Sequence, residues 1–405
     1  MKKYFLKYRG YHCLMFFVFI IQYPVLSQTL TLPQSIELAY KNNQLLKISS
    51  LETEGQQLLV KTARELPKTN FDVQLGRTQA AYTNDYVVGI VQQFSHPKYY
   101  QANADLQRSH VEATRRNMSI RKNEIAGTVK QIYYQILYYQ QLRQMLIQQD
   151  SLYRSTLKAA EARYKTGESN LLEKVNAEVR LREIINRLEI LNTDEGIAYQ
   201  QLKTLLNIEK SFQIDLLLPI RKDTTLISKE LSLVNNPTLS LYEQQTIIGK
   251  QQTMLEKQKL KPDFRVGIIN QSIEHNFNQM AVTAGIGIPI FNQAQKARIE
   301  AAKVNEKISV SNWQYIENQL KSDIIILKKA YQKYQQSLNY YEKFALPQAN
   351  LIIRNATTSY QNGEIEYLEF IQNSQQSWQI KEMYLSTILN LNQTIIQIET
   401  LLGIE

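Results

Sequence analysis

The chain reads RYKTGESNLLEKVN over residues 163–176 and SYQNGEIEYLEFIQ over residues 359–372. The two stretches share a tyrosine, a Gly-Glu pair, a leucine, a glutamate and a β-branched residue, all at an offset of 196 residues. Such a match between distant parts of one chain indicates an internal duplication, and a repeat governs how the rest of the sequence is interpreted.

Other landmarks recur in the same order. An Asn-Asn pair opens a helical pattern at 42–43 and again at 235–236, and each pattern ends at a proline. An ordered series of matches is unlikely to arise by chance, so the sequence predicts two copies of about 195 residues each. The copies are placed at 28–220 and 221–405, and they are expected to build one integrated domain.

Each copy is predicted to run helix, two strands, long helix, turn, helix. The first helix is expected at 32–65, and the long helix of copy one at 100–164, where Gly127 is the only glycine and no proline occurs. A helix of that length extends about 95–100 Å at 1.5 Å per residue. The long helix of copy two is expected at 293–360, with a kink at Pro347.

The apolar residues of the long helices follow a heptad step, which is typical of coiled coils. In copy two they are Leu320, Ile324, Leu327, Tyr331, Tyr334, Leu338, Tyr341 and Ala345. None of these helices contains the run of roughly 20 apolar residues that a membrane-spanning helix needs.

The predicted strands alternate apolar and other residues with period two. Copy one has Phe71, Val73 and Leu75, and copy two alternates from Phe264 to Ile268 and again over 282–290. Alternation predicts a sheet with one oily face, and strands of roughly 9–11 residues match tilted membrane-spanning strands. Alternation alone leaves a half-buried soluble hairpin equally open.

Four strands cannot close a transmembrane barrel, since the smallest such barrels have about eight strands. An open sheet edge is also incompatible with lipid. If the strands face lipid, several chains must combine them. Three chains would supply a twelve-stranded barrel, and their long helical hairpins would continue the tube as an α-barrel. The fold class is therefore mainly α with a small β part.

The first 27 residues have the pattern of a cleaved signal peptide. Lys2, Lys3, Lys7 and Arg9 precede a nine-residue apolar stretch that begins at Cys13. A membrane anchor, the alternative, needs a longer apolar run. Cys13 is the single cysteine of the chain, so no disulfide or Cys metal site is expected after cleavage.

Composition argues against nucleic-acid binding and catalysis. The formal net charge is +10, and removal of the four basic leader residues leaves about +6, spread among acidic residues. After cleavage His96, His110 and His275 remain, without other ligands at metal-binding spacing, and no phosphate loop or nucleophile motif is present. We therefore predict no enzyme activity, no cofactor and no resident metal, and we interpret His110 as a surface residue rather than a ligand.

The predicted elements occur twice in the same order: helix, strand pair, long helix, Tyr-x-x-Gly-Glu turn and helix. This duplicated order resembles the TolC family of outer-membrane efflux proteins. The resemblance covers about 29–403 and is carried mainly by residues 162–168, 287–292 and 359–364. It implies a homotrimer in the outer membrane of a Gram-negative bacterium, with a periplasmic helical barrel. It also implies a periplasmic adaptor, an inner-membrane RND-type pump and outer-membrane lipid as partners. Residues 32–94 look most like the heavy-metal branch, CusC- and CzcC-like.

The resemblance also assigns roles to the two turns. The expected adaptor-docking tip comprises Tyr164, Gly167, Glu168, Tyr360, Gly363 and Glu364. The expected aperture comprises Glu173, Glu369, Ile365 and Gln372. In the best-known member a basic residue stands where this chain has Ile365, so the same salt-bridge lock is not expected here. Packing of Ile365, Tyr367 and Leu368 is expected to close the aperture instead.

The function expected from these inferences is passive export of small solutes or metal cations through the outer-membrane part of a tripartite efflux system. Two alternatives stay open. The same fold could serve type I protein secretion, which differs only in cargo. The chain could also be a structural or adhesive periplasmic coiled-coil protein with soluble hairpins, which would explain the heptads but leaves the oily strand faces without a role.

Overall fold

The computed structural model describes residues 28–77, 84–216, 231–274 and 276–404. The signal peptide expected at residues 1–27 and the boundary expected between residues 220 and 221 lie outside these ranges.

The described elements follow the predicted order in both halves of the chain. The first half contains β1 (Gln28–Leu30), α1 (Leu32–Asn42), α2 (Gln44–Leu59), a 3-10 turn (Val60–Arg64), β2 (Asn70–Gly76), β3 (Asp85–Phe94), α3 (Pro97–Thr166), α4 (Leu171–Leu206) and β4 (Phe212–Ile214). The second contains a 3-10 turn (Leu233–Asn235), α6 (Pro237–Gln258), β5 (Asp263–Ile273), β6 (Asn276–Gly287), α7 (Gln293–Tyr340), a π-helical turn (Tyr341–Ala345), α8 (Leu346–Gln361) and α9 (Tyr367–Leu402).

Two predicted helices are interrupted, each for a local reason. The helix expected at 32–65 divides at Asn43, whose side-chain oxygen accepts a hydrogen bond from the N–H of Leu45 at 2.9 Å and so starts α2 anew. The helix expected at 293–360 widens into the π-helical turn just before Pro347. Proline has no N–H and its ring crowds the carbonyl four residues earlier, and a π-helical turn is one way to accommodate that defect.

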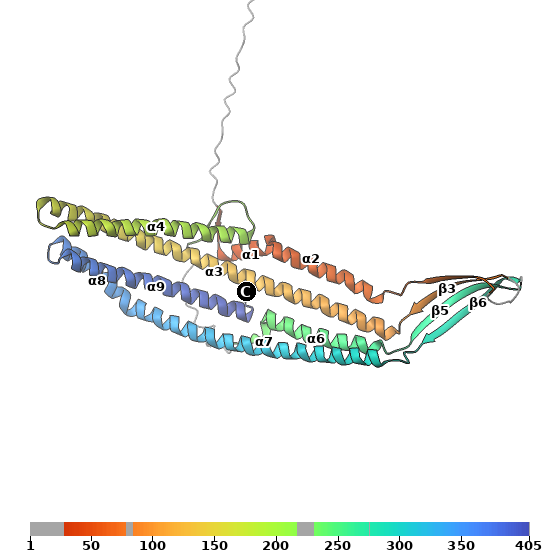
Figure 1. Cartoon of the computed structure of the whole chain (residues 1–405). Coiled ribbons are helices and arrows are strands. Elements are labelled where there is room, and N and C mark those ends of the chain that lie inside the picture. Colours follow the sequence, from red (N-terminus) through yellow and green to blue (C-terminus); the bar gives the residue numbers. More distant parts are fainter. Residues whose placement is uncertain (1–27, 78–83, 217–230, 275, 405) are drawn as a thin grey trace, which may run out of the picture.

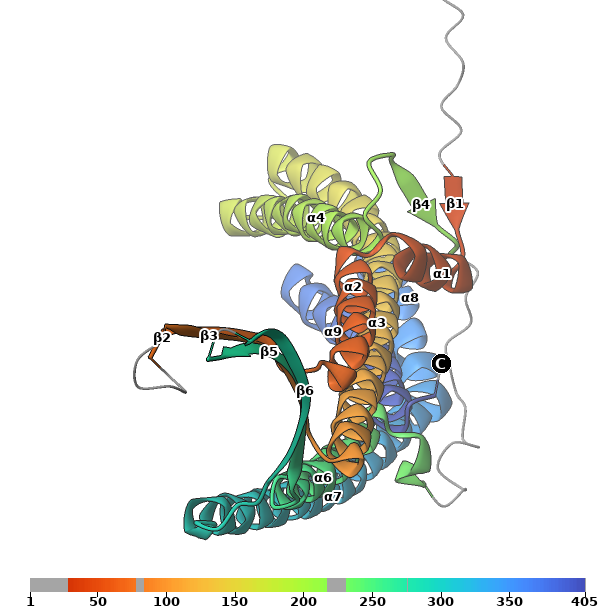
Figure 2. The same ribbon diagram turned by 90° about the vertical axis from the view of Figure 1, so that its right-hand side faces the viewer.

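The helices form one elongated, curved row (Figure 1). In the half near the sheet α2 packs on α3, α3 on α6 and α6 on α7. In the half that contains the two hairpin turns α4 packs on α3, α3 on α9 and α9 on α8. α3, with 70 residues, runs through both halves and is about 105 Å long. Figure 2 shows the row of helices and the sheet curving toward the same side.

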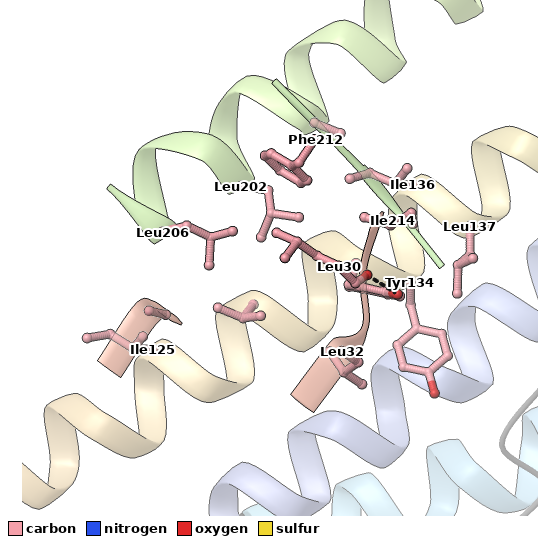
Figure 3. Close-up of a cluster of buried hydrophobic side chains, with 14 of the residues drawn as sticks. Leu30, Leu32, Ile125, Tyr134, Ile136, Leu137, Leu202, Leu206, Phe212 and Ile214 are labelled. Carbon is pink, nitrogen blue, oxygen red and sulfur yellow. Dashed lines mark hydrogen bonds between the residues drawn. The ribbon is translucent and has the colours of Figure 1, made fainter. Parts of the chain in front are cut away.

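A compact core fixes the middle of the row. β1 pairs in parallel with β4, and this small sheet, with α1, covers the outside of α3 and α4. Figure 3 shows Leu30, Leu202 and Phe212 gathered between these elements. Tyr133, which is fully buried, donates from its hydroxyl to the carbonyl of Leu30 at 3.0 Å, and this bond ties the sheet to α3.

The four-stranded sheet has the order β2-β3-β5-β6, with every neighbouring pair antiparallel. The register aligns Phe71 with Ile90, Ile90 with Ile268 and Ile268 with Val282. The predicted oily positions therefore share one face of the sheet. The side chains of Phe71, Ile90, Ile268 and Val282 are between 52 and 76 % exposed, so the chain's own helices leave this face uncovered, unlike a half-buried soluble hairpin.

Within the described ranges, every helix is either too short or too polar to cross a lipid bilayer.

Candidate functional site

The first hairpin turn connects α3 to α4. Gly167 has φ of 79°, a left-handed conformation that glycine adopts without steric cost. The N–H of Glu168 donates to the carbonyl of Arg163 at 2.9 Å, which closes the end of α3. The side-chain oxygen of Asn170 accepts from the N–H of Glu173 at 3.0 Å and starts α4. These caps fix Glu173 in the first turn of α4.

The second hairpin turn connects α8 to α9 in the same way. Gly363 has φ of 74°, and the N–H of Glu364 donates to the carbonyl of Ser359 at 2.8 Å. The carboxylate of Glu364 accepts from the Ser359 hydroxyl at 2.8 Å and from the Asn362 amide at 3.2 Å. These two hydrogen bonds lower the pKa of Glu364, so its negative charge is part of the turn.

A buried polar contact joins the two hairpins next to the turns. The hydroxyl of Tyr360 on α8 donates to Oε1 of Glu173 on α4 at 2.7 Å. Arg163 on α3 donates to the same oxygen at 3.3 Å, and its guanidinium lies 5.8 Å from the centre of the Tyr360 ring. We name Arg163, Glu173 and Tyr360 the tip lock.

Burial strengthens the tip lock. Tyr360 is 6 % exposed and Glu173 is 8 % exposed, and the Tyr360 ring stacks on Phe370 with ring centres 4.7 Å apart. Burial first, and then the hydrogen bond to Glu173, raise the pKa of the Tyr360 hydroxyl. The tyrosine therefore stays protonated and can donate to the carboxylate, a charge-assisted hydrogen bond in a water-poor environment.

Ion pairs between described residues also connect the hairpins away from the turns. Arg187 on α4 pairs with Glu382 on α9 at 2.7 Å, but both side chains are more than one-third exposed, so this pair adds little stability. Lys130 on α3 pairs with Glu399 on α9 at 3.1 Å, and both are almost fully buried. Of these contacts, the tip lock is the buried one that lies next to the turns. A small displacement of one hairpin there would separate the two turns.

The residues expected at the aperture are divided between two environments. Glu173 faces into the tip lock, whereas Glu369 and Gln372 are exposed three residues apart and so share one side of α9. Ile365 is half-buried against the apolar cluster that surrounds the tip lock. Leu368, which was expected to pack with it, is 66 % exposed.

The two tip tyrosines occupy matching repeat positions but differ in environment. Tyr164 is 41 % exposed, with the ammonium of Lys174 5.8 Å from its ring centre, and Tyr360 is buried against Phe370. Lys174 and Phe370 are themselves 196 residues apart, at matching positions of the repeat. Sequence reasoning missed the tip lock. The signal that could have indicated that Tyr360 is the buried tyrosine is the lysine at 174 in the first copy and the phenylalanine at the matching position 370 in the second.

Metal-binding groups are absent from the described residues: no three His, Cys, Asp or Glu side chains come together there. His96 caps α3, accepting from the N–H of Lys98 at 3.2 Å. His110 is half-buried rather than on the surface, and burial lowers its pKa. His275 lies outside the described residues.

No protein-family model and no curated protein matches the sequence. Several solved structures match the fold. The crystal structure of CusC, from a study of transmembrane channel formation, aligns with 92 % of each chain at 16 % identity and a TM-score of 0.78. The outer-membrane protein VceC of Vibrio cholerae aligns with 92 % of this chain and 96 % of its own, at 14 % identity and a TM-score of 0.75.

The outer-membrane channel CmeC of Campylobacter jejuni aligns with 92 % of this chain and 85 % of its own, at 13 % identity and a TM-score of 0.73. At these identities the likeness concerns the fold. The chain has the fold of solved outer-membrane channels, as the resemblance to the TolC family predicted.

Proposed function

We propose that this chain, which has the fold of the TolC-family channels, is one protomer of a homotrimeric outer-membrane duct in a Gram-negative bacterium. It conducts solutes passively and catalyses no reaction. Its partners are outer-membrane lipid, a periplasmic adaptor and an inner-membrane RND-type pump, which select and deliver the cargo.

The uncovered oily face of the sheet is the observation that carries this proposal. Leu75, Val282 and Ile286 on this face are between 63 and 77 % exposed, which is costly in water and favourable in lipid. β2 and β6 are edge strands whose outer hydrogen-bonding groups need partners in a membrane. Because the strands alternate in direction, β6 of one copy can pair antiparallel with β2 of the next. Three copies then close a ring of twelve strands.

The curved row of helices supports the same assembly. α2 and α7 are the outermost helices near the sheet, and both have exposed apolar residues. They include Leu45, Ile48 and Leu58 on α2 and Val304, Ile308 and Tyr315 on α7. A ring that places α7 of one copy beside α2 of the next covers both sets, and the curvature visible in Figure 2 leaves a passage along the axis.

The repeat fits one integrated unit. The packing of α3 of the first copy on α6 and α9 of the second supports one shared core for the segments at 28–220 and 221–405. We propose that both copies contribute one hairpin each to the same tip.

We place the adaptor-docking end at the turns that carry Gly167 and Gly363. There the tip residues Tyr164, Glu168 and Glu364 are exposed. Glu369, with Gln372 and Ile365 nearby, is proposed to line the aperture, where three copies form a ring of negative charge that favours cations. The tip lock holds this end closed until a partner separates the hairpins. The cargo is therefore proposed to be small solutes or metal cations.

The test is to express the full chain, separate inner and outer membranes, and purify the protein in detergent. We expect outer-membrane fractionation, a trimer by light scattering, and ion conductance in planar bilayers. A stable water-soluble monomer would refute the proposal and favour the structural coiled-coil alternative.

A further inference from the structure

A cavity lies where two helices of the second repeat meet end to end. α9 ends at Leu402 and α6 begins at Pro237, and Figure 1 shows both ends between the long helices α3 and α7. The cavity there has a volume of about 490 Å³, a size that suits a small organic molecule. Its walls come from all four helices, so a single protomer builds it.

Hydrogen bonds hold the walls of this cavity in place. The side chain of Asn236, which is 3 % exposed, donates to the carbonyl of Leu401 at 2.6 Å and accepts from the N–H of Leu239 at 2.6 Å. Asn123 on α3 donates to the carbonyl of Thr400 at 2.6 Å. These bonds satisfy backbone groups at the end of α9 and the start of α6, so the two ends and α3 form one fixed frame.

The walls carry negative charge without a positive partner. Glu124 on α3 and Asp323 on α7 line the cavity, and no lysine, arginine or histidine is among its lining residues. The basic residues two positions before each carboxylate are engaged elsewhere: Lys321 pairs with Glu317 at 2.8 Å, and the ammonium of Lys122 lies 5.9 Å from the ring centre of a tyrosine in α1. Neither lining carboxylate forms an ion pair with another described residue.

The rest of the lining has an apolar side. Leu320 and Leu327 on α7 and Leu401 on α9 contribute to it. An apolar wall with a few placed polar groups is the usual lining of a pocket for a small organic ligand. A hydrated metal ion would leave that wall unused, and in the ranges that the structure describes no three His, Cys, Asp or Glu side chains come together.

The equivalent junction of the first repeat has the opposite charge. There the side chain of Asn43 donates to the carbonyl of Leu205 at 3.2 Å, as Asn236 does in the second repeat. The hollow beside it is lined by Lys41, Lys47 and Lys122 and by no acidic residue. The acidic character of the second junction is therefore its own and is not inherited from the duplication.

We propose that the cavity between α3, α6, α7 and α9 binds a small organic cation with an apolar body, such as an aromatic quaternary ammonium or a protonated amine. Glu124 and Asp323 hold the charge, and the leucines cover the body. The site goes beyond the proposed channel function and does not depend on it, because one protomer supplies every wall.

Ethidium is the probe for the test, since it is an aromatic cation whose fluorescence rises when it is shielded from water. The full chain is purified in detergent and titrated with ethidium, and detergent alone gives the background. We expect saturable binding of one ethidium per protomer. Phenanthridine, its uncharged parent ring, should displace ethidium only at concentrations at least tenfold higher than those at which ethidium itself binds.

The charge variant is Glu124→Gln with Asp323→Asn, which keeps the shape of both side chains. We expect it to bind ethidium at least tenfold more weakly than the wild type. The matched control is Asp105→Asn with Glu300→Gln, which removes one aspartate and one glutamate from the same two long helices at surface ion pairs. The control should bind ethidium as the wild type does.

A third variant, Thr128→Trp, blocks the space and keeps both charges. Thr128 lines the cavity and is exposed, so the larger side chain can be placed there without disturbing the core. It should also weaken ethidium binding at least tenfold. If the charge variant and Thr128→Trp both bind like the wild type, ethidium sits elsewhere and the site is refuted.

Other outcomes also overturn the proposal. Uptake of ethidium that never exceeds the detergent background means that the cavity takes no organic cation. Equal binding of phenanthridine means that the carboxylates play no part, and displacement of ethidium by micromolar calcium means that the site takes a metal ion. Failure of the channel function is distinguishable from all of these, because the same titration applies to a water-soluble monomer.

Discussion

Removal of one hydroxyl group from the tip lock should open the proposed duct. In the variant Tyr360→Phe the ring keeps its stacking on Phe370, while Glu173 loses the 2.7 Å hydrogen bond that joins the hairpins. A hydrogen bond to a charged group contributes about 1.5–3 kcal/mol, so the closed state of each protomer should weaken about 10- to 150-fold relative to an open one. If three protomers move together, the loss is about 4.5–9 kcal/mol per channel.

The measurement is single-channel conductance of purified particles in planar bilayers. We expect the wild-type particle to dwell mostly in a low-conductance state and the Tyr360→Phe particle to dwell mostly in a high-conductance one. Cells that carry the variant should also become sensitive to an antibiotic too large for ordinary porins.

Tyr367→Phe is the matched control. Tyr367 is 7 % exposed and belongs to the same apolar cluster, but its hydroxyl has no hydrogen-bond partner among the described residues. The same chemical change should therefore leave the closed state intact. If Tyr367→Phe opens the channel as much as Tyr360→Phe does, the closure depends on packing and the tip lock is not the gate. If neither variant changes conductance, the constriction lies elsewhere.

Three further predictions follow from single positions. The variant Glu369→Lys should reverse or abolish the cation preference of the channel in reversal-potential measurements. The control variant Glu300→Lys, at an exposed position of α7, should not. Equal effects of the two variants would mean that Glu369 lies away from the passage. The variant Gly167→Ala should destabilise the hairpin by about 1–2 kcal/mol, because Gly167 has a positive φ. The control variant Gly55→Ala, in the middle of α2 with open space around it, should be neutral or stabilising. Thermal unfolding measures both effects. Burial raises the pKa of Tyr153 from 10.0 to about 12, so the folded chain holds the Tyr153 proton more tightly than the unfolded chain. The free energy of unfolding should therefore fall as the pH rises from 10 toward 12. The variant Tyr153→Phe should show a smaller fall in unfolding curves measured at alkaline pH.

The element order and the oily face of the sheet could be predicted from the sequence because both depend on periodicity. Leu320 and the apolar residues that follow it show the heptad step of α7 directly. The period-two pattern from Phe264 assigns each side chain to a face once the strand direction is known. The register then confirms that these residues share one face. Interruptions were harder, since the break at Asn43 depends on its side-chain hydrogen bonds and not on a proline or glycine.

The two turns next to the candidate site were expected from the sequence, but the contact that joins them was not. The glycines of both turns, Gly167 and Gly363, were expected from the repeat and adopt the left-handed conformation. The contact between Glu173 and Tyr360 spans 187 residues of sequence, and nothing local to either residue encodes it. Repeat symmetry even misleads here, because it presents Glu173 and Glu369 as equivalent although one is buried and the other exposed.

The chemistry of the tip lock suits a gate that a partner protein opens. Breaking the hydrogen bond between Tyr360 and Glu173 in all three copies costs about 4.5–9 kcal/mol. A single binding event with micromolar affinity supplies about 8 kcal/mol. A partner that binds only the open arrangement could therefore shift the equilibrium by its binding free energy alone, without a chemical energy source in the duct. When the hairpins separate, the Tyr360 hydroxyl and the Glu173 carboxylate exchange one hydrogen bond for bonds to water, so the polar groups of the tip lock are compatible with a water-filled passage.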